Sequence, residues 1–208
     1  MNDVKNILVG LSLADALGVP VEFKSRQQLK LDPVNTMREF GTHGQPAGTW
    51  SDDSSLSFCL AQSLSQSFDL IDIATKFVAW KNENYWTPRG RVFDIGNQTA
   101  AAIETLERLL EKNNKEGIEL LRYDQFQDEL SNGNGSLMRI LPLIFEIKGK
   151  HIKEQFECIW KVSALTHPHI RSAIACLIYL KFAEFVYQGF GLKESYNNMK
   201  LEVNKFLV

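Results

Sequence analysis

The sequence predicts an all-α protein, on three observations. Apolar residues recur every three or four positions, which is the spacing of one helix face. No run of alternating apolar and polar residues is bounded by hairpin turns, although a short strand around residues 38–40 stays open. Glycine- and proline-rich segments separate the helical stretches, with no internal repeat or Ser/Pro-rich linker. We therefore expect residues 1–208 to form a single domain.

The predicted helices follow one another along the chain. The first is apolar and ends near Gly18, and the most regular has Asn97 as its expected N-cap and stops at Asn113 and Asn114. The other helices carry these apolar stripes: Leu56, Cys59, Leu60 and Leu64; Ile73, Phe77 and Trp80; Ile170, Ile174, Leu177 and Ile178. Most chemically reactive side chains lie in the loops over residues 41–48, 87–96, 131–135 and 166–169.

The composition excludes several classes of protein. Of the 208 residues, 44% are hydrophobic and 23% are charged, which is typical of a soluble globular protein and excludes a disordered or fibrous chain. The 23 basic and 25 acidic residues give a net charge of -2, so no overall positive field favours a specific nucleic acid or an acidic membrane as partner. The three cysteines are far apart in the sequence, which favours a reducing, cytoplasmic location.

Two apolar stretches have features of a signal peptide or of a membrane-spanning helix. Residues 7–13 precede Ala14-Asp15-Ala16, which resembles a cleavage site, but the residues before them hold one Lys against one Asp and lack the positive charge of a signal peptide. Residues 170–187 contain Arg171, Lys181 and Glu184, and charges at such depths are unfavourable in lipid. We expect the second stretch to be a buried helix and the protein to have no membrane partner.

An oxygen-rich segment, residues 48–55, opens one of the predicted helices. It holds the adjacent carboxylates of Asp52 and Asp53 between the hydroxyls of Ser51 and Ser54. Hard oxygen donors of this kind suit Mg²⁺, Mn²⁺ or Ca²⁺. Ser and Asp are also preferred at helix N-termini, where an acidic residue typically contributes about 0.3–1 kcal/mol. From these residues alone, helix capping and metal binding both stay open.

Two further carboxylates precede this segment. Asp15 lies in the first apolar helix, where an isolated carboxylate needs a cation, a donor or a cleft, although it also suits a helix end next to Gly18. Glu22 follows Pro20 on an extended segment and, taken alone, is typical of a surface glutamate. Neither residue assigns a function by itself.

In combination, five short motifs resemble the ADP-ribosylglycohydrolase family in kind and in order. Each motif is weak alone, but the five in register cover residues 10–167. They are Gly10-x-x-x-Ala-Asp15-Ala-Leu-Gly18-Val-Pro-Val-Glu22; Gly48-Thr-Trp-Ser51-Asp52-Asp53-Ser54; Asp94-Ile-Gly96-Asn-Gln-Thr99; Ser131-Asn132-Gly133-Asn-Gly-Ser136-Leu-Met138-Arg139-Ile-Leu-Pro142; and Thr166-His167. The resemblance implies an all-α enzyme that removes ADP-ribose from an ADP-ribosylated protein or small acceptor.

The resemblance also implies a metal centre. Ser51, Asp52 and Asp53 match the family's ligands for a pair of Mg²⁺ or Mn²⁺ ions, with Ser51 where the family more often has Thr. Glu22 and Asp94 match acidic positions tied to catalysis or to orienting the site. For hydrolysis at the anomeric carbon of ribose, a metal held by Asp52 and Asp53 would serve as the template, and Glu22 or Asp94 would handle the proton.

Residues of the later motifs match the part of the family that holds ADP-ribose. They are Gly96, Asn132, Gly133, Asn134, Gly135, Ser136, Met138, Arg139 and His167. A glycine-rich loop lets backbone amides approach a diphosphate, and we expect a helix to begin at Ser136 behind it, although such a loop is also typical of an ordinary turn. Arg139 lies in an apolar run and is expected to be buried against a carboxylate.

The remaining candidates are histidines and aromatic residues. No Cys or third His lies near His167 and His169 to complete a zinc site, so we expect His167 to hydrogen-bond the substrate or the helix that follows Pro168. Four aromatic residues lie near the motifs and could stack on adenine or belong to the core: Trp50, Tyr85, Trp86 and Phe93.

The sequence departs from the family towards its C-terminal end. Family members are longer and carry a second acidic motif, Asp-x-Asp followed by Thr or Ser, whereas the last aspartate here is Asp128. A truncated, C-terminally incomplete chain is the first expectation, ahead of a second polypeptide that completes the site or a loss of turnover. Truncation would expose apolar surface and favour self-association. The alternative function is a non-catalytic scaffold or binding relative that lost the second metal motif.

Overall fold

The computed structural model describes residues 2–123 and 132–208, which fold into helices joined by loops. No strand occurs in either range, so the all-α prediction is confirmed and no strand forms at residues 38–40. The α-helices are α1 (Asn2–Gly18), α2 (Arg26–Leu31), α3 (Asp52–Leu64), α4 (Leu70–Glu83), α5 (Asn97–Glu111), α6 (Lys115–Leu120), α7 (Ile144–Ile147), α8 (Ile152–Ala164), α9 (Ile170–Tyr187) and α10 (Leu192–Leu207). The short 3-10 helices are η1 (Val19–Val21), η2 (Leu121–Tyr123) and η3 (Leu141–Leu143).

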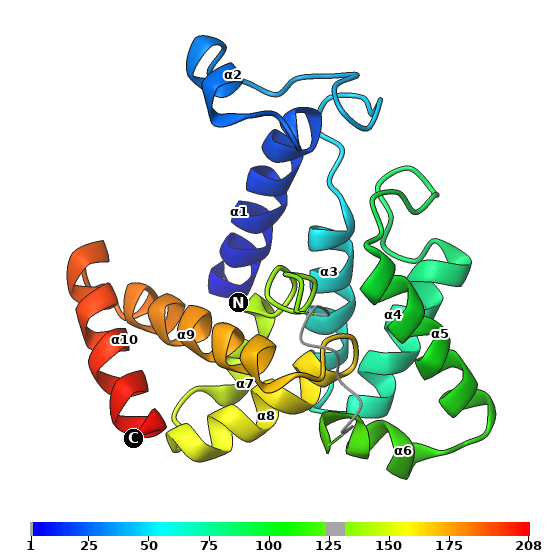
Figure 1. Ribbon diagram of the computed structural model, residues 1–208, viewed down its shortest axis with the longest axis vertical. Coiled ribbons are helices and arrows are strands. Elements are labelled where there is room, and N and C mark those ends of the chain that lie inside the picture. The colour runs from blue at the N-terminus through cyan, green and yellow to red at the C-terminus, as the bar shows by residue number, and fades with distance from the viewer. Residues whose placement is uncertain (1, 124–131) are drawn as a thin grey trace.

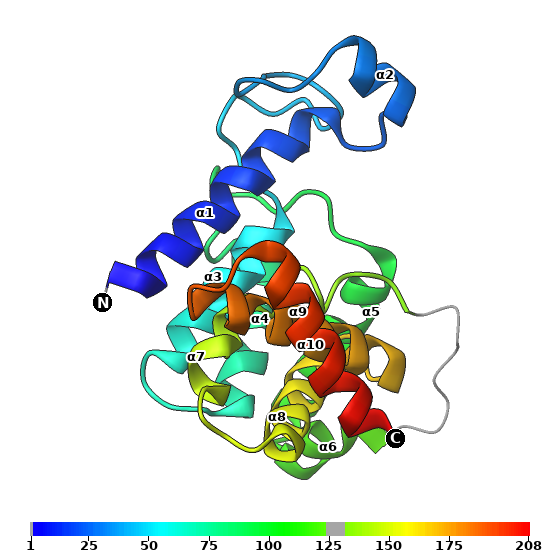
Figure 2. The same cartoon turned by 90° about the vertical axis from the view of Figure 1, so that its left-hand side faces the viewer.

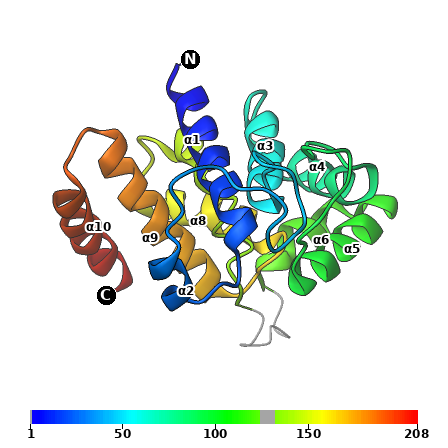
Figure 3. The same ribbon diagram turned by 90° about the horizontal axis from the view of Figure 1, so that it is seen from above.

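The helices form two groups on either side of α3. Seen from above in Figure 3, α4, α5 and α6 lie on one side of α3, and α8, α9 and α10 lie on the other. Helix α3 contacts α4 in the first group and η3 towards the second. Leu56 and Leu60 of α3 and Phe77 and Trp80 of α4 are buried in the shared core. This packing gives the N-terminal end of α3 a fixed position.

Helices α1 and α2 extend away from this body (Figures 1 and 2). Helix α1 contacts α3 and η3, and α2 lies beyond its C-terminal end. Ala16 of α1 is buried, whereas Val9 and Leu13 are 54% and 53% exposed. An apolar helix therefore presents part of its apolar surface to the outside.

One segment in the described part of the chain is long and apolar enough to cross a membrane. It covers Asp3–Val21, 19 residues with a mean hydropathy of 1.4, and 22% of it is buried. Helix α9 does not meet the same test. In α9, Lys181 forms ion pairs with Glu184 at 2.6 Å and with Glu202 of α10 at 2.9 Å. These two carboxylates balance the charge of the buried Lys181, as expected for a buried helix.

The helix ends confirm some capping predictions and correct others. Ser51 caps α3, because its Oγ accepts a hydrogen bond from the backbone N–H of Asp53. Helix α5 starts one residue earlier than predicted, since the extended Gly96, and not Asn97, is its N-cap. His169 caps α9 by accepting the N–H of Arg171 at Nδ1, so the capping role considered for His167 is wrong.

The helix predicted to begin at Ser136 is not formed. Residues 135–139 form turns, and η3 and α7 follow them. Pro142 explains the difference, because an α-helix from Ser136 would need the N–H that proline lacks at that position. The glycine-rich loop therefore has no long helix behind it.

Candidate functional site

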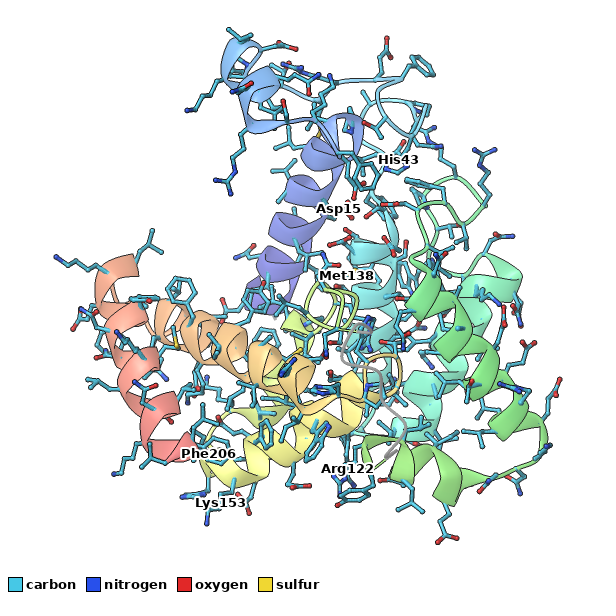
Figure 4. The ribbon with its side chains drawn as sticks, viewed as in Figure 1. Asp15, His43, Arg122, Met138, Lys153 and Phe206 are labelled. Atoms are coloured by element: carbon cyan, nitrogen blue, oxygen red, sulfur yellow. The ribbon has the colours of Figure 1, made fainter. Side chains whose placement is uncertain are left out.

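The carboxylate of Asp15 joins α1 to the beginning of α3. It accepts hydrogen bonds from the backbone N–H and the hydroxyl of both Ser51 and Ser54. The first N–H groups of a helix have no partner inside the helix, and a negative charge at that end is favoured by the helix dipole. Figure 4 shows Asp15 at this junction, between His43 and Met138. A helix N-terminus thus supplies the donors that the sequence required for this carboxylate.

The adjacent carboxylates of Asp52 and Asp53 lie in the first turn of α3. Burial, followed by the charges of Asp53, Asp94 and Asp15, raises the pKa of Asp52 to about 8. Burial and then the charge of Asp15 raise the pKa of Asp53 to about 6, against a hydrogen bond from Ser51. No ion pair between residues in the described ranges involves Asp15, Asp52 or Asp53. Buried carboxylates without a cationic side chain are unfavourable, and a bound cation would relieve their repulsion.

Glu22, His43 and Asp94 form a second group of side chains with metal-ligand character. His43 Nε2 lies 2.7 Å from Glu22 Oε2 and 3.7 Å from Asp94 Oδ2. One ligand atom from each residue lies within 4.8 Å of the other two. Burial and then the neighbouring Glu22 raise the pKa of Asp94 to about 6, and His43 acts in the opposite direction. The structure therefore brings Glu22 and Asp94, both candidates from the sequence, close to the same histidine.

The loops that carry Glu22 and His43 are held together by their backbones. Thr42 donates from its N–H to Pro20 O at 3.1 Å and from its Oγ1 to Glu22 O at 2.7 Å. Gly41 packs so closely on this segment that a Cβ there would lie 1.9 Å from Pro20 O. Only glycine permits this approach, which sets the position of Glu22 relative to His43.

The glycine-rich loop meets His167 and α5. A Cβ at Gly135 would lie 2.6 Å from His167 Cε1 and 2.7 Å from Thr99 Oγ1, so glycine is required there. A Cβ at Gly133 would lie 3.6 Å from His167 Nε2, which is an ordinary contact. His167 itself is 1% exposed, and burial and then the charge of Arg139 lower its pKa to about 4. A neutral imidazole therefore lies against the loop.

These groups share one pocket of about 510 Å³. That volume falls within the range of small-molecule sites, roughly 300–1,000 Å³. The lining residues are Glu22, Phe23, Asp52, Asp53, Asp94, Gly96, Asn97, Gln98, Thr99, Gly133, Asn134, Gly135, Met138 and His167. The carboxylates, the glycine-rich loop and the neutral imidazole border the same pocket. A ligand inside it can therefore contact carboxylates and neutral polar groups at the same time.

Four residues predicted for the site do not line this pocket: Ser51, Asn132, Ser136 and Arg139. Ser51 lies beside it, in a smaller pocket that also touches Asp53 and Glu22. Asn132 and Ser136 line a separate small pocket near α9. Ser131, at the start of the same motif, lies outside the described residues.

Arg139 is buried as predicted, but no carboxylate in residues 2–123 or 132–208 pairs with it, so the expected partner is not found there. Its Nη2 donates to Val162 O at 3.2 Å and to Thr166 Oγ1 at 2.7 Å, and its guanidinium lies 4.5 Å from the ring centroid of Phe77. None of the ion pairs in the described part of the chain involves Arg139. A carbonyl, a hydroxyl and an aromatic face take the place of the anion. Burial lowers the pKa of Arg139 to about 10, so the group stays cationic at neutral pH.

Sequence reasoning missed five residues of the site: Phe23, His43, Asn97, Gln98 and Thr99. The last three lie inside the motif that begins at Asp94 and form the first turn of α5, so the motif itself was a sufficient signal. His43 stands alone in its glycine-rich loop, and no local pattern marks it. Phe23 follows Glu22 with a positive φ of 62° and is 81% exposed, and neither property can be read from the sequence.

The four aromatic residues considered for adenine stacking do not line the pocket. Trp50 and Trp86 pack on Phe58, with ring centroids 5.6 and 5.4 Å apart, and Phe93 packs on His43 at 5.6 Å. Tyr85 and Trp86 both donate hydrogen bonds to Gln62 Oε1. The four side chains therefore contact neighbouring side chains and not the pocket. Phe23 is the aromatic residue that the pocket contains.

Comparison with known proteins gives a family match and several relatives. The family model described as ADP-ribosylglycohydrolase matches residues 1–204. The chain is 35% identical over 144 residues to ADP-ribosylarginine hydrolase Tri1 of Pseudomonas putida (strain GB-1), covering 68% of this chain and 35% of that protein. It is 37% identical over 106 residues to ADP-ribosylarginine hydrolase Tri1 of Serratia proteamaculans (strain 568), covering 50% and 28%.

A third relative matches over a longer segment. The chain is 27% identical over 196 residues to the ADP-ribosyl-(dinitrogen reductase) glycohydrolase of Rhodospirillum rubrum, covering 89% of this chain and 58% of that protein. The chain therefore spans 58% or less of the length of each of these relatives.

Proposed function

The chain belongs to the ADP-ribosylglycohydrolase family, and from this premise we propose that it acts in the metal-dependent hydrolytic removal of ADP-ribose from an acceptor. The bond cleaved would be the one at the anomeric carbon of ribose. One observation carries the proposal: the carboxylates of Glu22, Asp52, Asp53 and Asp94 share a pocket with the glycine-rich loop and His167. A pure scaffold has no reason to concentrate carboxylates in a pocket of ligand size.

The residues of the pocket fit a divalent cation that prefers oxygen ligands. Asp52 and Asp53 would hold it, with the Ser51 hydroxyl beside them, and Glu22, His43 and Asp94 form a neighbouring ligand group. The raised pKa values of Asp52 and Asp53 reflect burial first and then the negative charge of neighbouring aspartates, which no described cationic side chain offsets. Mg²⁺ or Mn²⁺ is the proposed ion. When bound, such an ion orients the ribose hydroxyls and lowers the pKa of a bound water.

The chain's own residues bind, orient and transfer protons in the proposed reaction. Glycoside cleavage needs a carboxyl group that donates or accepts a proton at the reacting centre. Glu22 and Asp94 are the two candidates for this carboxyl group at the pocket. The hydrogen bond with His43 holds Glu22 in position. The glycines at 133 and 135 let a ligand approach the loop backbone closely, as a diphosphate requires.

Arginine-linked ADP-ribose on a protein is the proposed substrate, with a small acceptor as the alternative. Two relatives are named ADP-ribosylarginine hydrolases, which supports this acceptor. A guanidinium is a planar cation, and Glu22 and Asp94 place negative charge beside the exposed ring of Phe23 in the same pocket.

We also propose a cytoplasmic location. Cys59, Cys158 and Cys176 are free thiols, and Cys59 and Cys176 are buried. Burial raises the pKa of the Cys59 thiol to about 12, which makes it unreactive at neutral pH. Unpaired thiols of this kind suit a reducing compartment.

Calorimetry with ADP-ribose, in the presence and absence of Mg²⁺ or Mn²⁺, tests the proposal. We expect metal-dependent binding that is lost in the double variant Asp52→Ala, Asp53→Ala. Asp32→Ala is the matched control, because Asp32 is an exposed carboxylate that follows the last residue of α2 and pairs with Arg38 outside the pocket. Binding that ignores both the metal and the double substitution would overturn the metal-dependent site.

Release of ADP-ribose from a protein modified on arginine separates catalysis from binding. Turnover that needs the metal and Glu22 supports the hydrolase. Metal-dependent binding without release from any modified acceptor supports the second candidate, a non-catalytic binding relative.

A further inference from the structure

Arg139, Thr166 and His167 form a buried chain of hydrogen bonds that ends at the pocket. Arg139 and Thr166 are 0% exposed, and His167 is 1% exposed. Arg139 Nη2 donates to Thr166 Oγ1 at 2.7 Å, and Thr166 Oγ1 lies 2.9 Å from His167 Nδ1. The proposed function gives no role to Arg139 or Thr166, although together they contact one nitrogen of a pocket residue.

The donors in this chain determine where the proton of His167 lies. A guanidinium can only donate, so Thr166 Oγ1 accepts from Arg139. The single hydrogen of the Thr166 hydroxyl then needs an acceptor, and among the described residues His167 Nδ1 is the one within hydrogen-bond distance. A neutral imidazole that accepts at Nδ1 carries its proton on Nε2.

The Nε2 atom of His167 faces the glycine-rich loop. A Cβ at Gly133 would lie 3.6 Å from Nε2, and one at Gly135 would lie 3.3 Å from it. His167 and both glycines line the pocket, and no residue in the described ranges hydrogen-bonds to Nε2. Because neither glycine has a side chain, no Cβ stands between this N–H and the loop, and His167 lines the pocket although it is 1% exposed.

We propose that Arg139 is a positioning residue which, through Thr166, fixes His167 as the neutral Nε2–H tautomer and thereby presents a hydrogen-bond donor to an oxygen of the bound ligand. The identity of that ligand, ADP-ribose, rests on the proposed function, whereas the tautomer follows from the contacts of the chain itself. A phosphate or ribose oxygen accepts such a bond, and a ligand N–H does not. Burial and the charge of Arg139 support the neutral form, because they lower the pKa of His167 to about 4.

Nitrogen NMR of the imidazole rings in the full chain tests the tautomer. At about pH 8, where histidines are normally neutral, we expect His167 to show a protonated Nε2 and an unprotonated Nδ1. His151 and His169 serve as internal references, because Nδ1 of each accepts a backbone N–H. The His167→Asn variant assigns the signal. A protonated Nδ1 in the wild-type protein overturns the proposal.

A pair of substitutions at Thr166 tests the relay. Thr166→Val keeps the shape and removes the hydroxyl, so we expect mixed tautomers and an affinity for ADP-ribose lower by about threefold to tenfold, the loss of one hydrogen bond. Thr166→Ser keeps the hydroxyl and should keep both the tautomer and the affinity. Circular dichroism checks that each variant folds. These variants are preferred to Arg139→Met, which leaves a cavity in the core and is itself at risk of unfolding.

The outcomes separate the tautomer from the ligand. A Thr166→Val variant that keeps the Nε2–H form overturns the relay. A variant that loses the fixed tautomer yet binds ADP-ribose like the wild type overturns the donor role. Failure of the wild type to bind ADP-ribose overturns the donor role and the proposed function together, and the tautomer assignment is then judged by NMR alone. A change in the Nε2 signal with ADP as well as ADP-ribose places the acceptor in the ADP part of the ligand, and a change with ADP-ribose alone identifies the distal ribose.

Discussion

At the scale of single residues, Asp15 contributes to stability through an unusual concentration of hydrogen bonds. Its two carboxylate oxygens accept from four donor groups of Ser51 and Ser54. In Asp15→Asn, one oxygen becomes an amide that faces the same donors. We expect the free energy of unfolding to fall by about 2–3 kcal/mol, as for hydrogen bonds to a charged group, measured by denaturant titration.

Asp3→Asn is the matched control for that measurement. Asp3 is an exposed carboxylate on the same helix and accepts one hydrogen bond, from Tyr187 Oη at 2.9 Å. We expect its substitution to change the free energy of unfolding by less than about 1 kcal/mol. Equal decreases in the free energy of unfolding for the two variants would contradict a larger stabilising contribution of Asp15.

The pKa of His167 predicts a loss of stability in acid. Its pKa is lowered from 6.5 to about 4 in the folded protein, so between these values the unfolded chain binds more protons. The free energy of unfolding therefore falls as the pH drops from about 6.5 towards 4. Comparing stability at pH 7 and pH 5, we expect the wild type to lose about 2 kcal/mol more than His167→Asn. Parallel pH profiles for the two proteins would show that His167 does not titrate in this way.

The site could be predicted from the sequence where its chemistry lies in adjacent residues. Asp52 and Asp53 follow a helix cap, and the same local pattern marks both the cap and the carboxylates. His43 could not be found in this way, because its contacts with Glu22 and Asp94 join three separate loops. Such contacts arise from the packing of the loops and leave no periodic pattern in the sequence.

At the scale of elements, the close approach of two loops sets the position of Glu22 and His43. Gly41→Ala places a Cβ 1.9 Å from Pro20 O, and two backbone segments must then separate. We expect this variant to lose the Thr42 hydrogen bonds, to unfold about 2–3 kcal/mol more easily, as overpacked sites do, and to bind ADP-ribose more weakly. Thermal denaturation and calorimetry measure the two effects.

Gly10→Ala provides the control for the substitution at Gly41. No atom lies within 4 Å of a Cβ at Gly10, which is inside α1, so alanine should stabilise the helix slightly. If Gly41→Ala is as stable as Gly10→Ala and binds ADP-ribose equally well, the loops do not depend on this contact.

The elements were more predictable than their ends. Helix α5 was expected from its apolar stripe, and its start differs by one residue because Gly96 supplies the cap. The helix expected at Ser136 failed for a stronger reason, since Pro142 interrupts the backbone hydrogen bonds that it would need. Apolar periodicity indicates where a helix is favourable, and a proline in its interior interrupts the helix.

At the scale of the whole molecule, the all-α class followed from periodicity, but the arrangement of the helices did not. The sequence predicted that the first helix is apolar, and the structure shows that α1 extends from the body and keeps Val9 and Leu13 more than half exposed. Periodicity predicts that a helix has an apolar face without identifying what covers it. The polar contacts of Asp15, together with the packing of Ile7 and the burial of Ala16, define where α1 joins the rest of the protein.

The exposed face of α1 predicts self-association of this chain. Val9 and Leu13 are one helical turn apart, and exposed apolar surface of this kind favours contact with another apolar surface. We expect sedimentation velocity to show a concentration-dependent dimer that the double variant Val9→Lys, Leu13→Lys abolishes, because lysine keeps the helix and adds charge to the face. Leu120→Lys is the control, since Leu120 is 49% exposed on α6, away from α1. A wild type that stays monomeric at every concentration, or a dimer that the double variant leaves intact, would show that this face is not the interface.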